Sequence, residues 1–187
     1  APKKANIEIN PISVLVGESL TATVTHIDNE TGVDAENSKW VLTQSPDEIG
    51  TGEDVISQYT GSFDANPGTI TVDTSTVGTY YLHILTVDNS GNKTETVSSA
   101  ITISSITGTV TQNGQVTWSA GQATLVLQSS ETAGSQHKIV YKINGEGEWQ
   151  DYNGTSITGL SHGDTVTACL TTASQTTYGP EAEFEIQ

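Results

Sequence analysis

The segment GTYYLHILTVD, residues 78–88, decides the fold class. Successive side chains of a β-strand point to opposite faces, and this segment carries hydrophobic residues at that period of two. The two predicted faces consist of Tyr80, Leu82 and Ile84 on one side and Tyr81, His83 and Leu85 on the other. We predict a long central strand whose first face points into a core and whose second face, with His83, points outward.

The residues around this segment predict six further strands. They are residues 5–16, interrupted at Pro11, and residues 19–27, 38–45, 55–63, 68–73 and 94–103. Proline has no N–H donor and is tolerated at strand edges and bends. Seven short strands in about 100 residues are typical of an immunoglobulin-like antiparallel β-sandwich.

Three positions match landmarks of that fold. Tyr80 stands two residues before Leu82, as the tyrosine of a tyrosine corner stands before the second cysteine of antibody domains. Ala22 or Val24 would take the place of the first cysteine, with Trp40 packed between. The stretch 78–103, GTYYLHILTVDNSGNKTETVSSAITI, resembles bacterial immunoglobulin-like repeats of Gram-positive (Firmicutes) surface proteins. The resemblance covers most of residues 5–104 and implies one domain over residues 1–104.

Residues 105–187 predict a second antiparallel sandwich. Strands are expected at 115–119, 123–128, 137–143, 164–172 and 181–187, with an Asn144-Gly145 hairpin turn and Trp149 on the return strand. The strings TWSAGQATL, YKINGEGEWQDY and ITGLSHGDTVTACLTT resemble fibronectin III-like modules of similar surface proteins. The predicted fold class is therefore all-β, with two tandem Ig-like or FN3-like domains. Alternation on residues 164–172 places Cys169 on the outward face.

Composition excludes several functions. The chain has 22 acidic residues against six lysines, no arginine, and a net charge of −16. Such a surface repels the phosphates of nucleic acids, so no nucleic-acid partner is expected. No stretch approaches the roughly 20 apolar residues of a membrane-spanning helix. Motifs of serine hydrolases, zinc proteases and phosphate-binding loops are absent, which predicts a protein that is not an enzyme.

Two polar loops are the first candidate site. Residues 28–36, DNETGVDAE, and residues 88–92, DNSGN, would be the B–C and F–G loops, which emerge at the same end of such a sandwich. The side chains that could converge there are Asp28, Glu30, Asp34, Asp88, Asn89 and Asn92. Because Ca²⁺ takes six to eight oxygen ligands of this kind, calcium is the one cofactor considered. The alternative is that these residues satisfy their own backbone in turns.

Aromatic rings are the second candidate site. Trp40 and Trp149 are expected in the cores, which leaves Trp118 and Tyr178 as the candidates for exposed rings. Exposed rings can stack on the C–H faces of sugars. A neutral glycan suits an acidic surface without arginine better than an anionic one does. The alternative is core or cross-strand packing of both rings.

These features together predict a non-catalytic extracellular module. The first interpretation is a spacer or stalk of a bacterial cell-surface or cell-wall protein, because the resembling repeats act as spacers or binding units. One alternative is an adhesin or carbohydrate-binding appendage whose partner is a glycan or a protein on a host or cell surface. Another is an Ig-like domain of a phage tail or head fibre, located on the virion.

Overall fold

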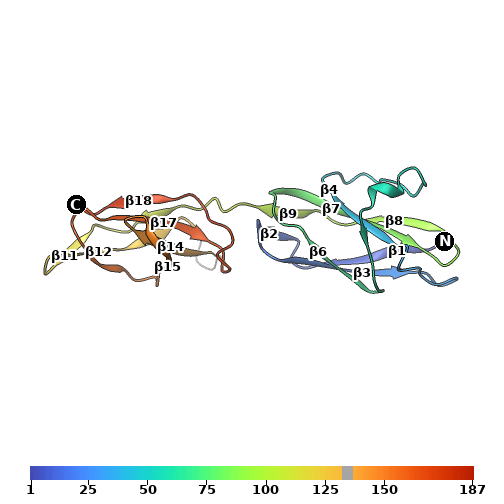
Figure 1. The fold of residues 1–187 in the computed structure, drawn as a ribbon, viewed down its shortest axis with the longest axis horizontal. Helices are drawn as coiled ribbons and strands as arrows, with labels where there is room; N and C mark the ends of the chain where they lie inside the picture. Colours follow the sequence, from blue (N-terminus) through green and yellow to red (C-terminus); the bar gives the residue numbers. More distant parts are fainter. Residues whose placement is uncertain (132–136) are drawn as a thin grey trace. The chain divides into compact units, whose positions relative to one another are not determined.

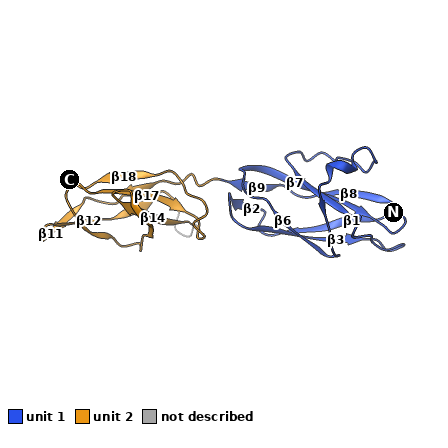
Figure 2. Ribbon diagram, viewed as in Figure 1, with its two compact units in different colours: residues 1–104 blue, residues 105–187 orange. Residues whose placement is uncertain are grey.

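A computed structural model describes residues 1–131 and 137–187. The chain forms two compact units, residues 1–104 and residues 105–187 (Figure 2). Both consist of β-strands in several mostly antiparallel sheets, so the all-β prediction is confirmed (Figure 1). No helix among the described residues is long and apolar enough to cross a membrane.

Unit 1 is a sandwich of two sheets. Its strands are β1 (Lys3–Ile9), β2 (Ser13–Leu15), β3 (Leu20–Ile27), β4 (Lys39–Thr43), β5 (Gly61–Ser62), β6 (Gly68–Val72), β7 (Gly78–Val87), β8 (Lys93–Val97) and β9 (Ile101–Ser104). One sheet has the order β1-β3-β6, and the other has the order β2-β9-β7-β4-β5, with β8 also paired to β7. The interruption predicted at Pro11 separates β1 from β2, and the chain changes sheets there.

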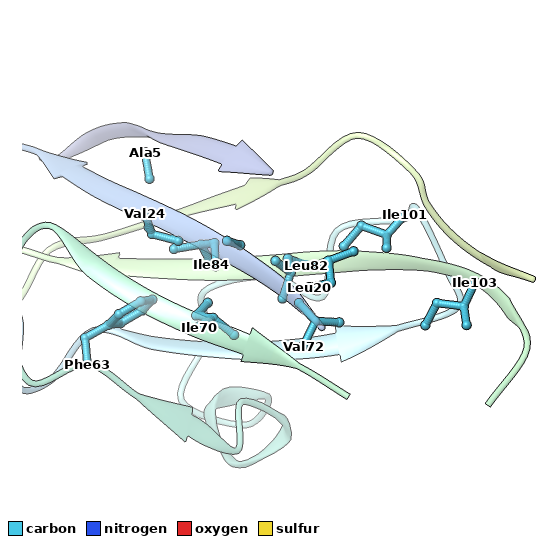
Figure 3. Packing of buried hydrophobic residues seen from close by; sticks show 11 residues of the cluster. Ala5, Leu20, Val24, Phe63, Ile70, Val72, Leu82, Ile84, Ile101 and Ile103 are labelled. Carbon is cyan, nitrogen blue, oxygen red and sulfur yellow. The ribbon is translucent and has the colours of Figure 1, made fainter. Parts of the chain in front are cut away.

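The two sheets enclose a continuous hydrophobic core. Leu20, Ala22, Val24, Ile70 and Val72 come from the first sheet, and Leu82, Ile84, Ile101 and Ile103 come from the second. Figure 3 shows these side chains gathered between the strands. Each large aliphatic side chain buried in this way contributes about 1.5–3 kcal/mol from removal of apolar surface from water. The residues that the alternation of β3 and β7 places on their inner faces therefore form part of this core.

The outer face of β7 differs from the prediction. His83 was expected to face outward, but it is completely buried. A second hydrophobic cluster covers this face, in which Leu85 and Val87 pack with Tyr59 and with Ile56. The segment between β4 and β5 folds over the sheet, so both faces of β7 are buried from residue 82 to residue 87.

The strand prediction for unit 1 contains two errors, and the covering segment explains the first. Residues 55–63 form a 3₁₀ turn over Ile56–Gln58 and only the two-residue strand β5. The apolar residues of this segment pack onto the outer face of the second sheet and do not extend that sheet. A Cβ added to Gly61 would lie 2.1 Å from the Trp40 ring, so β5 depends on glycine at that position. The predicted strand 94–103 is divided into β8 and β9, which pair with different parts of β7.

Unit 2 has its own core. Its strands are β10 (Val110–Gln112), β11 (Thr117–Ser119), β12 (Gln122–Leu125), β13 (Leu127–Ser129), β14 (Lys138–Ile143), β15 (Glu146–Asp151), β16 (Ile157–Leu160), β17 (Thr165–Thr171) and β18 (Ala182–Glu185). They form sheets of the order β11-β12-β16 and β15-β14-β17-β18, with a two-stranded β10-β13 sheet. Buried residues on several of these strands include Ala123, Leu125, Leu127, Ile157, Leu160, Val166, Ala168 and Leu170.

Cys169 does not lie on an exposed face as predicted. The residue is completely buried, and so is Val140, its partner on β14. Directly paired residues of antiparallel strands share a face. β17 is thus covered on both sides, and alternation alone does not reveal the cover. Burial, together with the charge of Glu181 and against that of Lys142, raises the pKa of the thiol to about 11.

Candidate functional site

The two polar loops of unit 1 meet. Asp34 donates its backbone N–H to the carbonyl of Val87 (2.9 Å), and Asn89 donates its N–H to Gly32 (3.0 Å). The side-chain amide of Asn89 also donates to the carbonyl of Thr31 (2.9 Å). These bonds hold the B–C and F–G loops together at one end of the sandwich.

The aspartates of these loops accept hydrogen bonds within their own turns. Asp28 accepts from the backbone N–H groups of Thr31 and Gly32, both at 2.8 Å. Although desolvation acts to raise the pKa of Asp28, these bonds lower it below the ordinary value. Asp88 accepts from the side-chain amide and the backbone N–H of Asn92, and these bonds lower the pKa of Asp88.

The remaining members of the predicted calcium set are dispersed. Asp34 accepts from the backbone and side chain of Asn37. The exposed Glu30 carboxylate lies 3.7 Å from the N-terminal ammonium of Ala1, which also lies 4.0 Å from Asp88. Among residues 1–131 and 137–187, no group of three or more His, Cys, Asp or Glu side chains is arranged to hold a metal ion. The loops converge as expected, but their oxygens stabilise turns, and calcium binding by them stays a prediction.

The aromatic residues of unit 2 form two exposed ring clusters. Trp118 is 43% exposed and its ring centroid lies 6.4 Å from that of His162. Tyr178 is 42% exposed and stacks on Trp149 with centroids 5.7 Å apart. The Lys142 ammonium lies 4.9 Å from the Trp149 centroid, which adds a cation–π contact to the stack.

The structure does not bring Trp118 and Tyr178 together. Trp118 contacts His162, which lies just before β17 begins, whereas Tyr178 pairs with Thr171 at the end of β17. A strand of seven residues spans about 20 Å. The two rings therefore belong to separate surfaces, and a single monosaccharide unit would contact only one of them.

Two features of unit 1 were not predicted from the sequence. The first is a buried polar pair in which His83 Nδ1 lies 2.9 Å from Glu95 Oε1. Glu95 also accepts from the N–H groups of Ile49 and Gly50, and although burial acts to raise the pKa of Glu95, these bonds lower it. This pair anchors the covering segment to the sheet. Ile49 and Gly50 lie 46 and 45 positions from Glu95 in the sequence, so no local sequence pattern predicts their contact with it.

The second feature is a cavity of about 290 Å³ beside the two loops. Its lining combines apolar, basic, acidic and amide side chains: Asp34, Asn37, Lys39, Glu53, Ile56, Leu85, Val87, Asp88, Asn89 and Lys93, with Gly91. Part of the predicted calcium set thus lines a cavity that also contains two of the six lysines.

No protein-family model and no curated protein matches the chain. Among solved structures, fibronectin(III)-like modules of Clostridium thermocellum CbhA are 14% identical, with a TM-score of 0.38 over 95% of this chain and 91% of that one. Three N-terminal domains of the outer capsid protein Hoc of bacteriophage RB49 are 17% identical, with a TM-score of 0.46 over 100% and 59%. The Bacteroides ovatus glucan-utilisation protein SGBP-B, solved with a mixed-linkage heptasaccharide, is 13% identical, with a TM-score of 0.30 over 97% and 47%.

Proposed function

We propose that this chain is a non-catalytic extracellular spacer or stalk module of a bacterial cell-surface protein of Gram-positive type. In this proposal, residues 1–104 are a bacterial Ig-like domain and residues 105–187 an Ig-like or FN3-like domain. A spacer must transmit tension between its ends without unfolding. The observation that carries the proposal is the parallel pairing of β2 with β9 in unit 1.

This pairing joins the second strand of unit 1, β2, to its last strand, β9, whereas the first strand, β1, pairs with β3. Ser13 pairs with Thr102 and Leu15 with Ser104. Beyond the strands, Val16 donates its N–H to the Ser104 carbonyl at 2.8 Å. Tension pulls β2 toward its N-terminal end and β9 toward its C-terminal end, so the two parallel strands slide against each other. All the bonds between them then resist together, whereas strands pulled apart from one end would lose them one at a time.

Unit 2 provides an internal comparison. Its first strand, β10, pairs with β13, and its last strand, β18, pairs with β17. In the part of the chain that the structure describes, unit 2 has no parallel strand pair of the kind that β2 and β9 form in unit 1. We therefore expect unit 1 to unfold at a higher force than unit 2 when the chain is pulled by its ends.

Single-molecule pulling of the full chain tests this proposal. Val16→Pro removes the N–H that bonds Ser104, while Val16→Ala shortens the same side chain and keeps that N–H. The expected result is a lower unfolding force of unit 1 in the proline variant alone, with the unit 2 force unchanged. A folded Val16→Pro protein that unfolds at the wild-type force would contradict the proposal, as would a unit 1 weaker than unit 2.

Glycan binding is a second candidate function, supported by the exposure of Trp118 and Tyr178. Tyr178 is held by its stack on Trp149, so a sugar would meet a ring that is already ordered. The net charge of −16 favours neutral glycans. The test is a screen of the full chain against mucin and neutral glycans, with Trp118→Ala and Tyr178→Ala as variants. Binding that persists in EDTA and is lost in one variant supports a glycan site at that ring. Binding that requires Ca²⁺ supports a site at the two loops of unit 1. If no glycan binds, the spacer remains the only proposed function.

A further inference from the structure

We propose that the cavity in unit 1 binds a small molecule of about monosaccharide size that carries a carboxylate on an apolar body. The site is separate from the β2–β9 pairing and from the rings of unit 2. Its lining comes from β4, β7, β8, the two loops and the segment that covers the outer face of β7.

An apolar floor is provided by Leu85 and Val87 of β7 and by Ile56 of the covering segment. Leu85 and Val87 are almost completely buried from solvent, and both belong to the second hydrophobic cluster. Ile56, which is only partly buried, therefore presents most of the apolar surface that the C–H face or the hydrocarbon part of a ligand can cover.

Two ammonium groups stand on opposite sides of this floor. Lys39 of β4 pairs with Leu85, and Lys93 of β8 pairs with Val87, so the strand registers put both lysines on the cavity face. The Lys93 ammonium forms an ion pair with Glu53. No carboxylate of the described residues lies within ion-pair distance of the Lys39 ammonium.

The state of Lys39 differs from that of the other lysines. Lys4 pairs with Glu48, Lys138 with Asp151, and Lys142 lies over the Trp149 ring. Lys3 also has no acidic ion-pair partner among the described residues, but it is exposed to water, whereas Lys39 is half-buried in the cavity wall. In a chain with 22 acidic residues, a half-buried lysine in the cavity lining with no ion-pair partner among the described residues is a position that an external carboxylate can pair with.

The acidic residues of the rim do not compete for Lys39. Asp34 accepts two bonds from Asn37, and Asp88 accepts from Ser90 and Asn92. Both carboxylates are therefore held by their own turns and leave the Lys39 ammonium unpaired, although their negative charges still oppose an anionic ligand. The remaining rim acid, Glu53, is occupied by Lys93.

Cavity size limits the ligand. A volume of about 290 Å³ lies just below the range of roughly 300–1,000 Å³ that holds drug-sized ligands. The site thus suits a uronic acid or an arylalkyl carboxylate and excludes an oligosaccharide from full enclosure.

NMR titration of the ¹⁵N-labelled full chain tests the proposal with three probes: D-glucuronate, 3-phenylpropionate and D-glucose. We expect the two carboxylates to shift the amide signals of Leu85 and Val87, and we expect glucose, which lacks the carboxylate, to leave them in place. Lys39→Gln should raise the dissociation constant of both carboxylates about tenfold or more, which is the usual range for the loss of a charge-assisted hydrogen bond. Lys39→Arg should retain binding, and Lys3→Gln should match the wild type.

Three results would overturn the proposal. They are equal shifts with glucose and glucuronate, no shift with either carboxylate, and unchanged affinity in Lys39→Gln. The spectrum of each variant shows whether unit 1 is folded, and the charge-retaining arginine variant separates loss of charge from loss of structure. Because none of these readouts involves force or the rings of unit 2, the proposal fails or stands independently of the spacer and glycan functions.

Discussion

Acidification should destabilise unit 1 through His26. This side chain is 3% exposed, its Nδ1 lies 2.8 Å from the Thr86 hydroxyl, and its ring packs edge-on against Phe63 with centroids 4.6 Å apart. Within the described residues, His26 Nε2 has no hydrogen-bond partner. A second proton would therefore place a charged, unsatisfied N–H in the core. Burial accordingly lowers the pKa of His26 from 6.5 to about 4.

The sign and size of the effect follow from this pKa. Between pH 6.5 and about 4 the unfolded chain binds a proton at His26 that the folded unit does not, so stability falls as the pH falls. The stability is fully present above pH 6.5 and is lost progressively toward pH 4. At 1.36 kcal/mol for each pKa unit, the loss amounts to about 3 kcal/mol.

Urea unfolding at pH 7 and pH 4.5 measures this loss. A background with Trp118→Phe and Trp149→Phe leaves Trp40 of unit 1 as the only tryptophan reporter. The matched variant is His26→Asn, which keeps a polar atom near Thr86 and does not titrate. The His26→Asn variant should be less stable at pH 7 because the imidazole ring is lost. Its free energy of unfolding should, however, decrease by about 2 kcal/mol less between pH 7 and pH 4.5 than that of the protein with His26. Equal pH dependence of the two proteins would refute the reasoning, since every other titrating group is shared.

Three further changes have defined outcomes. Gly61→Ala should destabilise unit 1 by about 2 kcal/mol or more in the same unfolding assay, because the new Cβ overlaps the Trp40 ring; an unchanged midpoint would contradict this. Cys169 should react with a thiol reagent at pH 8 about 100-fold more slowly in the folded than in the urea-unfolded chain, because burial raises its pKa to about 11; equal rates would show an open thiol. Tyr80→Phe should cost about 1 kcal/mol through loss of its bond to the Thr76 carbonyl (3.2 Å), and calorimetry of unit 1 unfolding would reveal no change if that bond is not made.

The inner faces of the strands could be predicted because the core imposes a local rule. On β3, Leu20, Ala22 and Val24 alternate with threonines, and all three are buried. On β7, the predicted inner residues Leu82 and Ile84 belong to the same core. A period of two is visible in one strand without knowledge of its neighbours, so single-strand reasoning is sufficient here.

The outer faces could not be predicted because they depend on segments distant in the sequence. His83 was read as exposed from alternation, yet it contacts Glu95 and is covered by residues between β4 and β5. The same reasoning failed for Cys169, whose face is covered in unit 2. Polar residues can lie on a buried face when they form hydrogen bonds there. The local pattern of such a strand is therefore the same as that of a strand with only one buried face.

The cover over β7 also determines what kind of site the cavity is. Lys39 and Lys93 are fixed by their registers on strands that pair with β7, and the floor beneath them is part of a packed cluster. Glu53, in contrast, comes from an irregular stretch and is 82% exposed, so the ion pair it makes with Lys93 is the weakly held part of the wall. A carboxylate that arrives at Lys39 thus meets a preformed floor and one cation without a competitor, and displacement of Glu53 would free the second cation at small cost. Binding to such a site loses little free energy to ordering, which allows a small ligand to bind through few contacts.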